Sequence, residues 1–140
     1  MDHSIVASVR ALLRQGQPPF PLAGLMGFTI TSIEHGCVVV EFQATADHTN
    51  PMGTLHGGVL CTLADTAMGI AHASILKDDE SYATVELKIN FLRPVREEKL
   101  RAIGKVVRAG KTLVLLECDI VNGGGQLAAR AMSTSMTLRV

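Results

Sequence analysis

The segment 57–76 constrains the fold more than any other part of the chain. Its apolar side chains recur around nearly the whole circumference of a helix, and a helix that is apolar nearly all round is normally buried. With 47% hydrophobic residues in 140, the chain has enough apolar surface for one packed domain and no room for a second. The sequence therefore predicts a single domain, 1–140, built around one long central helix.

Alternating segments predict the elements that surround this helix. Apolar and polar residues alternate with a period of two in 82–92, 97–108 and 112–122, and three glycines then lead into a further strand, 126–140. Segments 27–33 and 37–44 have the pattern of an earlier hairpin. Because only 57–76 is long enough to cover such a sheet, we expect an α+β fold in which an antiparallel β-sheet wraps around the central helix.

The pattern of residues in the strand 82–92 and in the N-terminal region predicts further detail. Strict alternation in 82–92 places these apolar side chains on one face: Ala83, Val85, Leu87, Ile89 and Phe91. Residues 4–15 have helical spacing, and the helix is expected to end at Gly16 and the proline-rich run 18–21. Region 1–21 is thus predicted to be an N-terminal helix with a proline-rich linker, and 46–56 a polar loop.

Composition disfavours several classes of function. The formal net charge is zero and only 4% of residues are aromatic, which argues against a nucleic-acid partner. The five histidines form no HxxxH spacing, the three cysteines form no CxxC pair, and no serine lies in a GxSxG motif. Asp65 and His72 interrupt the most apolar stretch, and the first four residues lack a secretory pattern. We expect a cytoplasmic protein without a metal, a cofactor or a membrane span.

The start of the central helix carries the first chemical signal. Unpaired backbone N–H groups at Gly57 or Gly58, with the positive end of the helix dipole, could stabilise a developing oxyanion. Asp65 follows inside the helix, where we expect burial among apolar side chains and therefore a partner or a function. The plainer alternatives stay open: glycines for close packing or a tight turn, His56 as a satisfied, partly buried histidine, and Asp65 bonded to backbone or threonine hydroxyls.

An amide donor and a carboxylate together suit transfer of an acyl group to water. Gly57 and Asp65 are eight residues apart, roughly 12 Å along a helix, whereas both must lie about 3 Å from the reacting atoms. One helix cannot easily present both groups to one carbonyl. Two antiparallel copies in a dimer can, so we predict a composite site across a two-fold interface.

Four motifs in the central part of the chain also resemble a known family. They are, in order, Asn50, His56-Gly57-Gly58, Asp65 and Ala83-Thr84-Val85. Together they look like those of the hotdog-fold acyl-CoA thioesterases of the phenylacetate-pathway (PaaI-like) type. The resemblance extends from about Leu22 to Val140, and its strand–helix–strand order agrees with the pattern of alternation.

The resemblance implies a role for each residue. The Gly57 N–H polarises the thioester carbonyl, with Asn50 and His56 shaping that side of the site. Asp65 of the partner subunit acts as base or nucleophile, and Thr84 helps to position water. The family forms dimers that often pair into tetramers. A branch of the family has Glu at the position of Asp65 and Thr one turn later, where this chain has Gly69; Thr84 would then take over that role.

A basic segment supplies a candidate contact for coenzyme A. Eight of the thirteen Lys and Arg residues fall within 88–111, opposed there by two glutamates. Such a strip could hold the phosphates of the nucleotide, and Arg93 and Lys111, both near turns, are the strongest candidates. The alternative is a solvated sheet face, which the alternation favours for Lys99, Arg101 and Lys105.

The sequence thus predicts an acyl-CoA thioesterase that needs no cofactor. Gly58 would also contact substrate, and the acyl pocket would be lined by the N-terminal segment and residues around Met52, Leu60 and Leu63. Two alternatives share the fold: a protein that binds acyl-CoA without turning it over, and a hydratase or dehydratase. The latter needs an Asp/His pair at one carbon, and His56 is poorly placed to pair with Asp65 in one chain.

Overall fold

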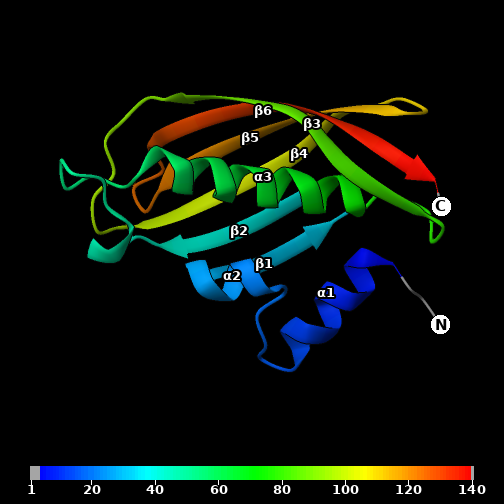
Figure 1. The fold of residues 1–140 in the computed structure, drawn as a ribbon, viewed down its shortest axis with the longest axis horizontal. Coiled ribbons are helices and arrows are strands. Elements are labelled where there is room, and N and C mark those ends of the chain that lie inside the picture. Colours follow the sequence, from blue (N-terminus) through cyan, green and yellow to red (C-terminus); the bar gives the residue numbers. More distant parts are fainter. Residues whose placement is uncertain (1–3, 140) are drawn as a thin grey trace.

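A curved antiparallel sheet surrounds helix α3 in the computed structural model, which describes residues 4–139 (Figure 1). The expected end of the last strand at Val140, and residues 1–3, lie outside that range. The helices are α1 (Ile5–Arg14), α2 (Pro21–Met26) and α3 (Gly57–Ala73), with a 3₁₀ turn at Ala46–His48. The strands are β1 (Phe28–Glu34), β2 (Cys37–Gln43), β3 (Glu80–Phe91), β4 (Lys99–Ala109), β5 (Leu113–Asn122) and β6 (Leu127–Arg139).

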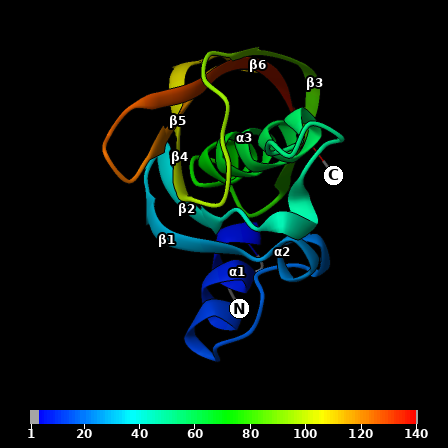
Figure 2. The same ribbon diagram turned by 90° about the vertical axis from the view of Figure 1, so that its left-hand side faces the viewer.

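The sheet contains six strands within residues 4–139, in the order β1-β2-β4-β5-β6-β3. All neighbouring pairs are antiparallel. Viewed along the helix, the strands curl around α3 on several sides (Figure 2). Strand β3 lies at one edge although it follows the helix directly in sequence. The predicted α+β fold, a sheet wrapped around a central helix, is confirmed.

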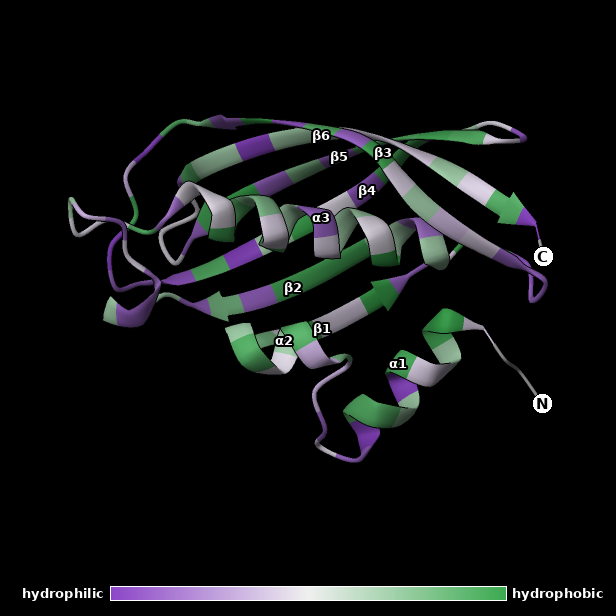
Figure 3. Ribbon diagram, viewed as in Figure 1, coloured by the Kyte–Doolittle hydropathy of each residue, from purple (hydrophilic) through white to green (hydrophobic). Residues whose placement is uncertain are grey.

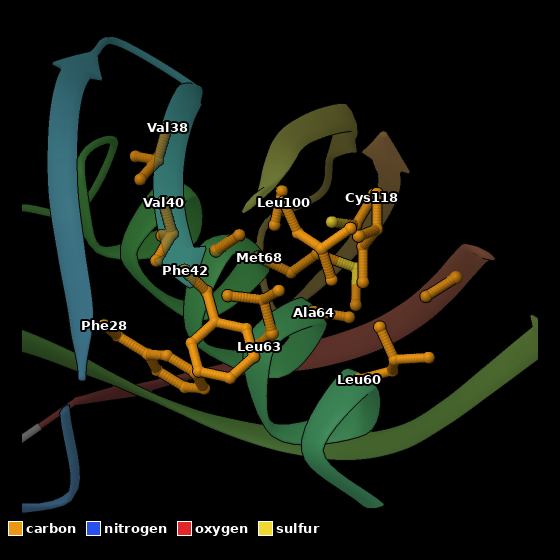
Figure 4. Close-up of a cluster of buried hydrophobic side chains, with 14 of the residues drawn as sticks. Phe28, Val38, Val40, Phe42, Leu60, Leu63, Ala64, Met68, Leu100 and Cys118 are labelled. Carbon is orange, nitrogen blue, oxygen red and sulfur yellow. The ribbon is translucent and has the colours of Figure 1, made fainter. Parts of the chain in front are cut away.

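The helix approaches the sheet most closely where it crosses β4. A Cβ atom added at Gly104 would lie 2.5 Å from the carbonyl carbon of Ala67, so only glycine fits between strand and helix. Around this crossing Leu63, Ala64 and Met68 pack with side chains of β1, β2, β4 and β5 (Figure 4). Helix α3 ends at Ala73, three residues before its predicted end.

Strand β3 departs from the predicted alternation because it contains a bulge. The register with β6 shifts between Thr84 and Glu86, and an inserted residue changes which side chains face the core. Leu87 and Ile89 pack against the core as expected, but Ala83 and Val85 are exposed. The prediction of one shared face is therefore wrong for the first half of the strand, where Thr84 reaches α3 instead.

The N-terminal region forms two helices outside the sheet. Helix α1 is close to its predicted extent, is capped by the Ser4 hydroxyl, and alternates hydrophobic with hydrophilic residues along its length (Figure 3). The Arg10 guanidinium donates to the carbonyl of Ile33 and ties α1 to β1. The predicted proline-rich linker runs into a second short helix that sequence reasoning missed. Pro21 occupies its first turn, where proline needs no hydrogen-bond donor.

Candidate active site

Asp65 lies in the middle of α3 and is held by a residue of the neighbouring strand. The Thr84 hydroxyl donates a hydrogen bond of 2.8 Å to Asp65 Oδ1. The expectation that Asp65 is buried is wrong for the single chain, where the residue is exposed. The threonine partner, one of the open alternatives, is present. It engages one carboxylate oxygen, while Oδ2 has no hydrogen-bond partner within residues 4–139.

Two hollows meet at Asp65. The larger has a volume of about 510 Å³ and extends beneath the N-terminal segment, lined by Ile5, Val9, Phe20, Ile70 and Tyr82 as well as Asp65. The smaller, about 390 Å³, has a lining that includes Asp65, Thr84, Cys61 and Leu87. The carboxylate therefore stands on the border between a mainly apolar cavity and a more open groove.

The N-terminal segment lines the larger cavity, whereas the other residues predicted around an acyl pocket do not. Leu60 is 3% exposed and Leu63 fully buried, and both belong to the core between helix and sheet (Figure 4). Met52 is 76% exposed on the loop that precedes α3. Leu60 and Leu63 thus face the sheet and not the cavity; a helix that is apolar all round gives no sequence signal for which face meets a cavity.

The first turn of α3 leaves one donor open. His56 caps the helix, and its Nδ1 accepts a hydrogen bond of 2.8 Å from the Gly58 N–H. The Gly57 N–H has no acceptor among residues 4–139. A Cβ at Gly57 would lie 2.9 Å from the ring of Phe91, so close packing, the plainer alternative, also applies here. His56 is exposed and not partly buried, and its side chain serves as the N-cap of α3 through Nδ1, so the available donor is Gly57 rather than Gly58.

Asn50 organises the loop that leads into this turn. Its Oδ1 accepts from the backbone N–H groups of Met52 and Thr54, and its Nδ2 donates to the Thr54 hydroxyl. These bonds close the loop 50–54. Asn50 therefore holds the loop before α3 in shape, and its role beside Gly57 stays a prediction.

Gly57 and Asp65 lie on one helix in the structure, two turns apart. At 1.5 Å per residue the separation along the axis is roughly 12 Å. Within one chain the free amide and the carboxylate do not meet, as the spacing predicted. A carbonyl in contact with both requires a second copy of the helix.

A buried polar cluster near the end of α3 is not among the features predicted from the sequence. His72 is 0% exposed. Its ring lies 2.8 Å from the Ser135 hydroxyl at Nδ1 and 3.0 Å from the Thr137 hydroxyl at Nε2. Ser135 itself donates to the carbonyl of Ala83, so it accepts from Nδ1–H, and Thr137 donates to Nε2. The inward-facing hydroxyl residues at alternate positions of β6 were the signal that could have revealed this cluster.

Burial raises the pKa of two further groups beside Asp65. The pKa of the Cys61 thiol is raised by burial first and by the negative charge of Asp65 second. The pKa of Tyr82 is raised by the same two causes in the same order. Both groups are therefore protonated at neutral pH and can donate hydrogen bonds there.

The basic segment does not form one patch. Arg93 follows β3 beside the start of β6, and Lys111 lies beside its far end, where its carbonyl accepts from Arg139. Lys99 pairs with Glu41 at 3.1 Å. Arg101 and Lys105 lie opposite Glu41 and Glu117 in the sheet, so the alternative of a solvated face describes these three residues.

Residues 4–139 show no sign of a membrane span or of a metal site. None of the helices within 4–139 has the length and hydropathy of a membrane span. The same part of the chain contains no group of three or more His, Cys, Asp or Glu side chains arranged to hold a metal ion.

Comparison with known proteins decides the family. Residues 52–129 match the family model of the thioesterase superfamily, a range that contains Gly57, Asp65 and Thr84. The chain belongs to the thioesterase superfamily. The predicted resemblance to hotdog-type, PaaI-like members is confirmed. Membership of this superfamily supports thioester hydrolysis as the general activity of the chain.

Individual relatives extend the match beyond that range. Acyl-coenzyme A thioesterase 13 of Homo sapiens is 31% identical over 108 residues, 76% of each chain. The 1,4-dihydroxy-2-naphthoyl-CoA hydrolase of Listeria monocytogenes is 31% identical over 97 residues, 69% of this chain and 79% of the relative. Among solved structures, the E. coli PaaI protein of the phenylacetic acid degradation operon superposes with a TM-score of 0.83 at 28% identity, covering 99% of this chain and 95% of that one.

Proposed function

We propose that this thioesterase hydrolyses acyl-CoA, with Asp65 of one subunit and the Gly57 amide of the other acting on the same carbonyl. The observation that carries the proposal is the 2.8 Å hydrogen bond from Thr84 to Asp65 at the border of the two hollows. It orients the carboxylate and leaves its second oxygen open. The relatives whose names specify CoA thioesters support this choice of substrate.

The reaction needs one base and one oxyanion donor. The free oxygen of Asp65 accepts a proton from water while the water oxygen attacks the thioester carbonyl carbon. The carbonyl electrons move onto oxygen, where the Gly57 N–H stabilises the negative charge. The intermediate then collapses, the C–S bond breaks, and the CoA sulfur leaves as a thiolate that takes up a proton. Direct attack by Asp65 would give an acyl anhydride, which water hydrolyses to the same products.

The two hollows suggest how the substrate lies. The larger cavity, beneath α1 and the segment before α2, is mostly apolar and suits the acyl group. The open groove beside Thr84 and Cys61 suits the thioester and the pantetheine arm. His56 caps α3 through the Gly58 N–H, while the Gly57 N–H is unpaired within residues 4–139. Gly58, bonded to His56, would contact substrate only by close approach.

The assembly we propose is a homodimer with two composite sites. In an antiparallel pair of α3 helices, the start of one helix meets the middle of the other, which brings Gly57 to the partner's Asp65. The same pairing brings opposite ends of the two sheets together, so Arg93 of one subunit and Lys111 of the other could hold one nucleotide. Exposed Leu113, Leu115 and Met132 on β5 and β6 give an apolar surface on which two dimers could pair. Three free cysteines suit the reducing cytoplasm.

Replacement of Asp65 by Asn tests the function. Asn keeps the shape and can still accept from Thr84, but it cannot take a proton from water. We expect turnover of acyl-CoA substrates to fall by at least 100-fold, the order of magnitude of one general base, with the fold and dimer unchanged. The free thiol released from a panel of acyl-CoAs measures this turnover.

A matched control is Asp78→Asn, because Asp78 is an exposed carboxylate in the loop after α3. It should retain full activity. If wild-type protein binds acyl-CoA but releases no thiol, the protein is a binding protein and not a hydrolase. If Asp65→Asn keeps wild-type turnover, Asp65 has no part in the mechanism.

A further inference from the structure

Tyr82 occupies a position that the proposed reaction does not use. It lies on β3, two residues before Thr84, and its ring packs on α3 at Gly69. A Cβ at Gly69 would lie 2.6 Å from the Tyr82 hydroxyl oxygen, so the ring can rest there only because residue 69 is glycine. On its other side the ring meets His72, with ring centroids 5.4 Å apart. Helix and buried histidine together fix the orientation of the phenol.

The Tyr82 hydroxyl is open to the larger cavity. Tyr82 lines this cavity together with Asp65, and within residues 4–139 its hydroxyl has no hydrogen-bond partner. No fully buried side-chain oxygen in that part of the chain lacks a partner, so the hydroxyl is not sealed in the interior. A tyrosine hydroxyl in an apolar setting normally finds a partner. Here a ligand in the cavity can supply it.

Other hydroxyl groups of the cavity wall are already engaged or face solvent. The Thr62 hydroxyl donates to the carbonyl of Gly58 at 2.9 Å, and that of Thr66 donates to the carbonyl of Thr62 at 2.8 Å. Ser8 is exposed at the outer rim on α1. Apart from the carboxylate itself, Tyr82 is therefore the polar group that the inner wall presents to a bound acyl chain. A few placed polar groups in an apolar pocket normally set ligand orientation and specificity.

Building on the proposed function, we propose that Tyr82 is the specificity-determining residue of the acyl cavity, selecting acyl groups that carry a hydroxyl or carbonyl oxygen one helical turn beyond the thioester. The distance follows from the fold. Gly69, on which the hydroxyl rests, is four residues after Asp65, roughly 6 Å along α3, and Tyr82 is two residues from Thr84, about 7 Å along β3. Both distances place the Tyr82 hydroxyl about one helical turn further along the cavity than the Asp65 carboxylate.

The test compares two substrates that differ only by the predicted partner: hexanoyl-CoA and 5-hydroxyhexanoyl-CoA. Wild-type protein should prefer the hydroxylated substrate in kcat/KM. Tyr82→Phe removes only the hydroxyl, and it should lower kcat/KM for 5-hydroxyhexanoyl-CoA about threefold to tenfold, the effect of one hydrogen bond. For hexanoyl-CoA the same variant should stay within twofold of wild type.

A second variant changes the helix residue on which the Tyr82 ring packs. In Gly69→Ala the new methyl group displaces the Tyr82 ring, so the preference should be lost although the tyrosine remains. Thermal unfolding shows whether each variant keeps its fold. An equal loss of activity on both substrates would mean that Tyr82 is merely structural, and an unchanged preference in Tyr82→Phe would also overturn the proposal.

Binding separates this proposal from the proposed function. Titration calorimetry with non-hydrolysable thioether analogues of the two substrates measures the preference without turnover. If neither CoA ester is hydrolysed but the hydroxylated analogue binds more tightly to wild type than to Tyr82→Phe, hydrolysis fails and the specificity of Tyr82 stands. If both are hydrolysed at rates and affinities that Tyr82→Phe does not distinguish, or if neither analogue binds, the assignment to Tyr82 is wrong.

Discussion

Replacement of Thr84 by Val removes the hydrogen bond to Asp65 and keeps the shape of the side chain. A hydrogen bond to a charged group contributes about 1.5–3 kcal/mol. Asp65 is exposed in the single chain, so solvent competes and the lower part of that range applies. About 1.4 kcal/mol corresponds to a factor of ten. We therefore expect kcat to fall about tenfold in Thr84→Val, with a much smaller change in KM, because the carboxylate loses its orientation and not its charge.

The matched control for this substitution is Thr84→Ser, which keeps the hydroxyl and removes only the methyl group. It should retain activity within about threefold of wild type. Steady-state release of free thiol from one acyl-CoA measures all three proteins under the same conditions. Wild-type kcat in Thr84→Val, or an equal loss in Thr84→Ser, would refute a role for the 2.8 Å contact in orienting Asp65.

Two further predictions concern stability. Burial lowers the pKa of His72, so below about pH 6.5 the unfolded chain binds a proton that the folded chain resists. The stability should be fully present above that pH and should fall as the pH drops below it. Urea unfolding at several pH values measures this free energy of unfolding. It should depend less steeply on pH in His72→Gln than in wild type, and as steeply as wild type in His35→Gln, which replaces an exposed histidine. Equal slopes in wild type and both variants would mean that His72 is not the source of the pH dependence. Gly104→Ala forces a methyl group against the backbone of Ala67 and should lower the free energy of unfolding by about 1–3 kcal/mol. Gly123→Ala has nothing within 4 Å of the added carbon and should lower it far less. Equal unfolding midpoints for the two variants would contradict the close crossing of α3 and β4.

The architecture could be predicted because its signals are local and repeated. The segment 57–76 is apolar around its whole circumference, and the strands that follow alternate over many residues. These patterns identify a central helix and an antiparallel sheet without knowledge of any contact. The bulge at Thr84–Glu86 leaves no such signal, because strict alternation of residue types continues through it. The same bulge turns Thr84 towards Asp65.

The candidate site could be predicted only in part for similar reasons. Gly57 and Asp65 stand out by chemistry and Thr84 only through the resemblance to a family, and the structure brings Asp65 and Thr84 into contact. The exposure of Asp65 could not be inferred, because sequence pattern alone does not say which part of an apolar helix the sheet leaves uncovered. The position of Tyr82 on Gly69 depends on a pairing between distant segments and has no local signal.

The claim that two subunits build each site can be tested by mixing two inactive variants. Gly57→Pro removes the N–H at the first position of α3, where the helix backbone accepts proline and the exposed Phe91 ring must move aside for the added atoms. Asp65→Asn removes the base. In a mixed dimer of the two, one site carries both defects and the other carries neither. Co-expression with two different affinity tags isolates that mixed dimer, and thiol release measures its turnover. We predict about half the activity of the wild-type dimer, although each homodimer is nearly inactive; a mixed dimer as inactive as its parents would contradict a shared site.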